Sequence, residues 1–106
     1  MTISILGQDY DFQEIAQKND PRLANCDGYT DNSTKVIRVN NDFNENDPAS
    51  IGDLSVFKKK VMRHEIIHAF FVESGLKNYN EDELIVDWIA LQFPKLLKTF
   101  TQVEAL

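Results

Sequence analysis

Apolar and histidine side chains recur at three- and four-residue steps in the second half of the chain. The repeating positions are Leu54, Phe57, Val61, His64 and His68. This period predicts a helix with one continuous face. Asp47 before Pro48 is typical of a helix start, and Gly75 is placed to cap the far end. We therefore expect one long helix from about Pro48 to Ser74.

The first 40 residues have the two-residue alternation of strands instead. Residues 3–5 and 10–12 alternate apolar and polar side chains around a turn at Gly7–Gln8. A second pair follows, in which Cys26–Thr30 and Val36–Val39 lie on either side of a polar turn. Each pair predicts an antiparallel hairpin with one buried face.

A further helix is expected to start near Asn80, and Pro94 should kink or restart it. Its broad apolar face contains Leu84, Ile85, Trp88, Ile89 and Leu91. The chain has 106 residues, which suffices for one core and is too short for two. The sequence thus predicts a single α+β domain over residues 1–106, with a small N-terminal antiparallel sheet of hairpins packed on the long helix and the C-terminal helix.

Composition and charge limit the partners and the cellular location that this chain is expected to have. A formal charge of −6 disfavours nucleic acid as a partner, because phosphates would be repelled. The longest apolar run, Ala69–Val72, is far shorter than the ~20 residues of a membrane span, so no membrane partner is expected. Cys26 is the single cysteine and no basic residue precedes Lys18, which favours a reducing, cytoplasmic location with Cys26 as a small buried side chain. The oligomeric state does not follow from composition.

The chain's two histidines both belong to one HExxH motif, His64-Glu65-Ile66-Ile67-His68. Four residues on a helix bring two imidazoles to nearly the same face, about 6 Å apart along the axis. Both can then bind one zinc ion. Glu65 lies close enough to contact a water molecule beside that ion, as a general base must. Glu73, five residues after His68, points off this face and is expected to be solvated.

A catalytic zinc site needs a third protein ligand, and without a further histidine a carboxylate is expected. Glu83 is the leading candidate, because Asp87 follows four residues later on the same helical face and could orient a ligand imidazole. A structural alternative exists for Glu83. Asn80 and Glu83 have the spacing of a capping box, and Tyr79 with Leu84 could form its hydrophobic staple.

These motifs resemble the gluzincin metallopeptidases, and most closely the ImmA/IrrE-like metallopeptidases and short HExxH proteins of phages and mobile elements. The metal-binding part of the resemblance is His64–His68 with Glu83–Ala90, which is similar to the family's ExxVE/DxxA stretch. Ile3–Gly7, Gly28–Thr30 and Ile37–Val39 occupy the places of the family's strand motifs. The resemblance therefore covers nearly the whole chain.

The resemblance implies a minimal zincin-like domain and a zinc-dependent metallopeptidase. By analogy His64, His68 and Glu83 would bind Zn²⁺, Glu65 would be the base and Asp87 would orient a ligand histidine. It also implies a polypeptide substrate, with narrow specificity for a regulator such as a host or phage repressor.

Two parts of such a site are less defined by the sequence. Many gluzincins stabilise the oxyanion with another histidine or tyrosine, and Tyr79 is the candidate here, although packing as a staple is its simpler role. An exposed strand edge beside the metal helix should hold an extended substrate, and we expect Val36–Val39 to form it.

A second function is a non-catalytic protein of a phage or mobile element that keeps a metal for folding or docking. Trp88, Phe93 and Phe100 would then form its partner surface. Burial in the core is the ordinary expectation for these three side chains.

Overall fold

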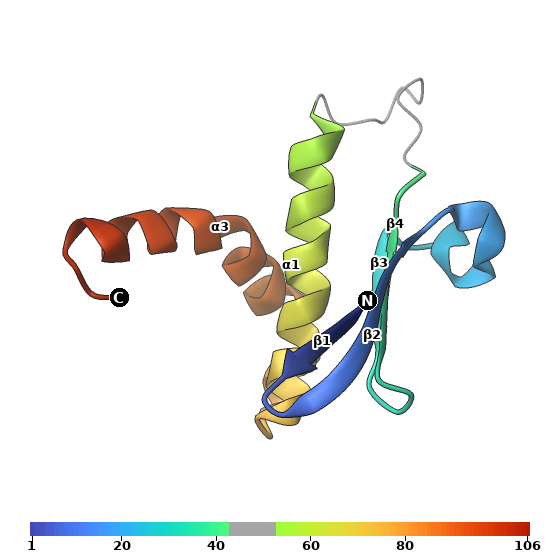
Figure 1. The fold of residues 1–106 in the computed structure, drawn as a ribbon, viewed down its shortest axis with the longest axis horizontal. Coiled ribbons are helices and arrows are strands. Elements are labelled where there is room, and N and C mark those ends of the chain that lie inside the picture. The colour runs from blue at the N-terminus through green and yellow to red at the C-terminus, as the bar shows by residue number, and fades with distance from the viewer. Residues whose placement is uncertain (43–52) are drawn as a thin grey trace.

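The structure is a computed structural model that describes residues 1–42 and 53–106. Within these residues a four-stranded sheet packs against helices, so the α+β class is confirmed. Figure 1 shows the sheet on one side of the long helix α1 and helix α3 on another. The expected helix start at Asp47–Pro48 lies outside the described residues.

The first hairpin forms as expected from its alternation. Strand β1 (Thr2–Ile5) pairs antiparallel with β2 (Gln8–Ile15), and Ile3 lies opposite Tyr10. Tyr10 is fully buried, because its side chain points from the sheet toward α1. The alternating residues thus supply one face of the core.

The second hairpin also forms, from β3 (Gly28–Asp31) and β4 (Val36–Asn40). At its turn the Asp31 carboxylate accepts hydrogen bonds from the backbone of Ser33 and Thr34 and from the Ser33 hydroxyl. These bonds, above all the one from the Ser33 hydroxyl, lower the pKa of Asp31 to about 2. The turn is therefore fixed by a charged side chain.

The expectation of a wholly antiparallel sheet is wrong at one ladder. Strands β2 and β4 pair parallel, which gives a mixed sheet in the order β1-β2-β4-β3. Two short 3-10 helices, η1 (Gln17–Asn19) and η2 (Pro21–Ala24), carry the chain across to β3. Alternation of apolar and polar residues predicts which side of a strand is buried. It does not predict whether two strands joined by a long connection run parallel or antiparallel.

Helix α1 runs over Leu54–Glu73. Asp53 is extended, and its side chain accepts hydrogen bonds from the Ser55 and Val56 amides, so Asp53 is the N-cap of this helix. The other end is as predicted. Gly75 has φ +81°, its amide bonds the Val72 carbonyl, and the next amide bonds that of Phe71. This is a Schellman cap, which requires a left-handed residue.

The C-terminal helix starts a few residues after the expected position near Asn80. A short helix α2 (Lys77–Asn80) ends before α3 (Glu83–Gln102), whose N-cap is Asp82. Pro94 lies inside α3, and Figure 1 shows that the helix bends along its length. The first half of α3 packs on α1, and both views show the second half extending away from the body.

The core lies between the sheet and α1. Its buried members are Ile5, Tyr10, Phe12, Ile37, Val39, Val61 and Ala69. Two expectations of burial are wrong. Cys26 is exposed, with its thiol donating to the Arg22 carbonyl. Trp88, Phe93 and Phe100 are 43–55% exposed. Trp88 lies about half a turn from the buried Val86 and Ala90, and Phe93 and Phe100 belong to the half of α3 that extends away from the body.

Candidate metal centre

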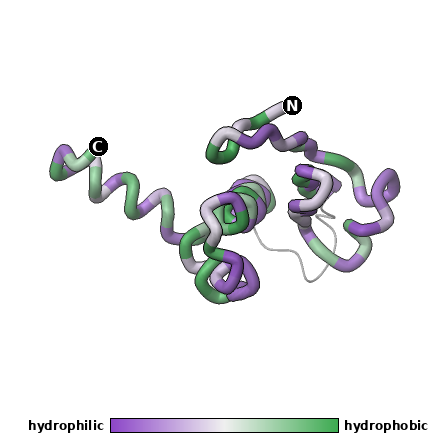
Figure 2. The backbone as a smooth tube through the Cα atoms, turned by 90° about the horizontal axis from the view of Figure 1, so that it is seen from below, coloured by the Kyte–Doolittle hydropathy of each residue, from purple (hydrophilic) through white to green (hydrophobic). Residues whose placement is uncertain are grey.

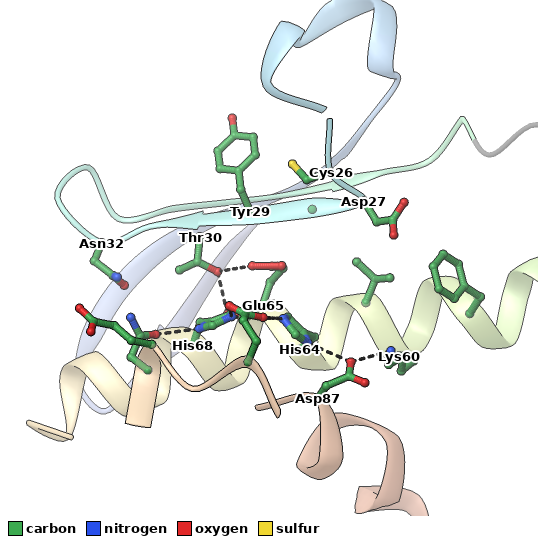
Figure 3. Close-up of a pocket in the computed structure, with 16 residues that line it drawn as sticks. Cys26, Asp27, Tyr29, Thr30, Asn32, Lys60, His64, Glu65, His68 and Asp87 are labelled. Carbon is green, nitrogen blue, oxygen red and sulfur yellow. Dashed lines mark hydrogen bonds and ion pairs between the residues drawn. The ribbon is translucent and has the colours of Figure 1, made fainter. Parts of the chain in front are cut away.

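The two histidines of the HExxH motif face each other on α1. The Nε2 atoms of His64 and His68 lie 3.1 Å apart, and their ring centroids are 4.8 Å apart. Figure 3 shows both rings on the side of α1 that lines a cleft. The four-residue spacing has therefore brought two nitrogen atoms to one point, as the helix period requires.

Glu83 completes a group of three. Its Oε2 lies 2.9 Å from His64 Nε2, and its Oε1 lies 3.0 Å from His68 Nε2. In the described residues these three side chains form a group that could hold a metal ion. Because Asp82 caps α3 in place of Asn80, the capping-box explanation of Glu83 is wrong.

Each imidazole has an acceptor at its other nitrogen. Asp87 Oδ1 lies 3.2 Å from His64 Nδ1, and Asn80 Oδ1 lies 2.8 Å from His68 Nδ1. Lys60 forms an ion pair with Asp87 at 2.6 Å, and this bond, with a smaller effect from His64, keeps the pKa of Asp87 below its usual value. With a metal ion on the Nε2 atoms, the ring protons would lie on Nδ1, where Asp87 and Asn80 accept them.

This arrangement fits a bound cation. With the protons on Nδ1, the Nε2 atoms of His64 and His68 present lone pairs to each other and to the Glu83 carboxylate. Three acceptors that converge without a proton between them repel, and a cation at their centre reverses that repulsion. Tetrahedral zinc with ligands at 2.0–2.1 Å separates neighbouring ligand atoms by roughly 3.3 Å. The two Nε2 atoms are 3.1 Å apart, and with one ligand atom from each residue the three atoms lie within 4.8 Å of one another.

Glu65 turns from the histidines toward strand β3. The Thr30 hydroxyl lies 3.0 Å from Glu65 Oε1 and 2.8 Å from the Glu65 carbonyl, so its one proton is shared between them. Glu65 is only 6% exposed. Burial raises the pKa of Glu65, and the neighbouring His64 and His68 together with Thr30 offset part of that rise.

Strand β3 approaches α1 closely at Gly28. A Cβ atom at this position would lie 3.1 Å from Glu65 Cγ, 3.1 Å from Val61 Cγ1 and 3.0 Å from the Arg38 carbonyl oxygen. Two of these contacts are with groups that cannot move freely, a backbone carbonyl and a branched core side chain. Gly28 therefore permits the approach that puts Thr30 against Glu65.

A cleft of about 670 Å³ runs between β3, α1 and the start of α3. Its lining includes Gly28, Thr30, His64, Glu65, His68, Asn80, Glu83 and Asp87. The expectation that Val36–Val39 is the exposed edge is wrong, because β4 lies between β2 and β3. The strand at the edge beside the metal helix is β3, one hairpin arm earlier in the chain.

Tyr79, the candidate oxyanion stabiliser, is not among the residues that line this cleft. Its side chain is about half exposed, and its ring is tilted against Phe71 with centroids 6.2 Å apart. Leu84 is 80% exposed, so the expected staple between Tyr79 and Leu84 does not form.

Three contributors to the centre were not predicted from the sequence, namely Asn80, Lys60 and Thr30. Asn80 had a signal, because it stood in the pattern as a capping candidate three residues before Glu83. Thr30 and Lys60 had none, since each meets its partner only through tertiary contact between separate elements.

Comparison of the chain with models of protein families, with curated proteins and with solved structures found no match. Among residues 1–42 and 53–106, no helix combines the length and the apolarity that crossing a bilayer requires. Function is therefore inferred from the side chains of the centre.

Proposed function

We propose that this chain is a zinc-dependent metallopeptidase that hydrolyses a peptide bond of a polypeptide substrate. The observation that carries the proposal is the convergence of the two Nε2 atoms, which lie 3.1 Å apart, on the Glu83 carboxylate, whose two oxygens lie 2.9 Å from His64 Nε2 and 3.0 Å from His68 Nε2. A buried carboxylate, Glu65, adjoins them in the same cleft. Together they match the three-ligand zinc site with a nearby general base.

His64, His68 and Glu83 would hold the ion and leave one coordination position for a small ligand. When bound, zinc supplies a Lewis acid that polarises a carbonyl group and lowers the pKa of water toward ~7. The ligand side chains are prepared for this role, since Asp87 and Asn80 fix both rings with Nε2 toward the centre. Glu83 remains 68% exposed, so the centre stays open to a substrate.

Glu65 is placed to handle the proton. Its carboxylate would take a proton from the attacking water and deliver it to the leaving amine. Burial favours the protonated carboxyl, which brings its proton affinity closer to that of the groups it serves. The Thr30 hydroxyl fixes one carboxylate oxygen and leaves the other for water.

Strand β3 supports a mode of substrate binding. It is an edge strand that borders the cleft, and its outer backbone groups are not used by the sheet. An extended peptide could pair with this edge and so pass in front of Glu65. A regulatory protein with an exposed extended segment is the substrate class that fits this edge.

A second candidate is a non-catalytic metal-containing interaction protein of a phage or mobile element. The exposure of Trp88, Phe93 and Phe100 favours it, since monomeric proteins rarely leave several large apolar side chains uncovered on one element.

Replacing Glu65 with glutamine separates these functions. In a peptidase, we expect E65Q to retain zinc at the wild-type stoichiometry and to lose peptide hydrolysis by about 10²- to 10⁴-fold. Zinc would be measured by mass spectrometry of the purified protein, and hydrolysis with a mixed peptide library. Asp9→Asn, which makes the same change from acid to amide at an exposed position outside the cleft lining, is the control. A zinc-loaded wild type that cleaves no peptide or candidate regulator would favour the second function.

A further inference from the structure

The face of α3 that packs on α1 continues beyond the body of the protein. Val86 and Ala90 on this face are fully buried in the first half of the helix. Steps of three and four residues carry the same face onward, to an exposed row in the second half. We call this row the α3 stripe, and it consists of Phe93, Leu96, Leu97, Phe100 and Val103.

Nothing in the described residues covers the α3 stripe. Helix α3 packs on α1 and α2, and its second half stands clear of the sheet and of α1 in both views. Phe93, Leu97, Phe100 and Val103 are 43–69% exposed. Half-exposed side chains of this size leave on the order of 100 Å² each, so these four offer on the order of 400 Å², which is in the range of the largest patch of a typical monomer.

The charged side chains in the second half of α3 lie on the face opposite the α3 stripe. Lys95, Lys98 and the polar Gln102 lie on the opposite face, and the stripe contains no charged residue. Depletion of charge at the centre of an apolar patch is a property of protein interfaces. Two such stripes can therefore face each other without repulsion between like charges.

We propose that the α3 stripe is the interface with a second copy of this chain, which lies antiparallel to the first. Antiparallel pairing end to end puts Phe93 of one copy opposite Val103 of the other, and Leu96 opposite Phe100. The two stripes together bury on the order of 800 Å², to which the stems of flanking polar residues add, and this is the size of a weak, transient interface. This interface does not depend on the metal centre.

The charge of Arg63 also favours this antiparallel pairing. Its Nε donates to the Ala90 carbonyl at 2.6 Å, where α3 leaves α1, and in the described residues no carboxylate forms an ion pair with its guanidinium. In the antiparallel pair, Glu104 of the second copy lies opposite Gln92, two residues along α3 from the Ala90 carbonyl that Arg63 contacts. Each copy therefore brings an anion toward the part of α3 where the other has a cation.

Sedimentation velocity of the full chain tests the proposal, from about 1 to about 200 µM protein. We expect the wild type to dimerise within this range, and Phe100→Glu to raise the dissociation constant at least ~30-fold, because it puts two charges into the apolar centre. Gln102→Glu adds the same charge to the opposite face and should change the constant less than ~3-fold. Circular dichroism would verify that both variants fold, and Leu97→Glu replaces Phe100→Glu if that variant does not.

A wild type that stays monomeric at about 200 µM would overturn the proposal and leave a different protein as the occupant. Equal dimerisation of wild type and Phe100→Glu would also overturn it. Glu104→Lys should weaken the dimer about two- to five-fold at low salt, and no effect would exclude the antiparallel register. Zinc content, which these variants leave unchanged, reports on the proposed metal centre separately.

Discussion

The two halves of α3 contrast sharply. In the first half Glu83 and Asp87 bond to His64, and Val86 and Ala90 are buried against α1. In the second half Phe93, Leu97, Phe100 and Val103 of the α3 stripe are 43–69% exposed. One continuous amphipathic helix thus contributes a polar centre at one end and a bare apolar face at the other, and what lies beside each half makes the difference.

The contrast has a simple geometric cause. Helix α3 has 20 residues and is therefore about 30 Å long, and α1 covers only its first turns. Glu83 is near the N-terminus of α3, so it meets His64 and His68 where the helices are closest. The stripe begins where contact with α1 has ended.

The largest expected effect is a loss of zinc affinity when a ligand in the first half of α3 is replaced. Glu83→Gln removes the one anionic ligand, and we expect zinc affinity to fall by about 100-fold or more. Glu81→Gln changes a neighbouring carboxylate that contacts neither histidine and should leave zinc affinity within about 2-fold. Competition against a chelator of known affinity measures both.

Equal zinc affinity of Glu83→Gln and wild type would show that the carboxylate merely accepts hydrogen bonds from the imidazoles. Asp82, which caps α3, is intact in both variants. Misfolding of the helix start would therefore not explain a loss of zinc.

A smaller effect is expected on the free energy of unfolding, when one valine in the packed half of α3 and one at its exposed end are each replaced. Val86 is fully buried and Val103 is 69% exposed, and both belong to α3 or its C-cap. Val86→Ala should lower the free energy of unfolding by about 2 kcal/mol, and Val103→Ala by less than about 0.5 kcal/mol. Urea unfolding at about 1 µM, where self-association is least, measures both. Similar losses for the two variants would mean that the second half is covered in solution even at that concentration.

The smallest effect concerns a polar group outside both halves. Glu73 was expected to be solvated, and instead it accepts a hydrogen bond from Tyr10 at 2.7 Å and pairs with Lys35. These bonds, first the one from Lys35, lower the pKa of Glu73 below its usual 4.5. A depressed folded-state pKa stabilises the fold above pH 4.5, and this contribution is lost as the pH falls through the folded-state value.

Glu73→Gln should therefore lower the melting temperature modestly at pH 7, and the difference from wild type should shrink toward pH 3. Calorimetry at the two pH values measures it. A difference that is independent of pH would mean that Glu73 acts through packing alone.

Local patterns predicted much of the fold because their causes are local. The period of α1, the Schellman cap at Gly75 and both hairpins depend on residues a few positions apart. The parallel pairing of β2 with β4 was missed, and so was β3 as the edge strand. Those features depend on how a long connection crosses the sheet, and alternation carries no information about that.

The residues of the candidate site also divide into those that local spacing predicted and those that only tertiary contacts bring together. His64, Glu65 and His68 were evident because one helix spaces them, and Glu83 followed from its four-residue distance to Asp87. Thr30 is 35 residues from Glu65, and its hydroxyl meets the carboxylate only because Gly28 lets β3 approach α1. Whether this site is a peptidase stays a prediction.

The sequence alone determined where two imidazoles face each other, because a helix turns by a fixed angle per residue and needs no other element to do so. It also predicted an apolar face for the C-terminal helix, but Leu84, Trp88 and Leu91 of that face are 51–80% exposed, and Val86 and Ala90 are buried instead. Only the tertiary structure decided which part of that apolar face is buried, and which acceptors meet His64 and His68. Burial and long-range hydrogen bonds depend on how far one element reaches along another, and that distance is a property of the packed chain.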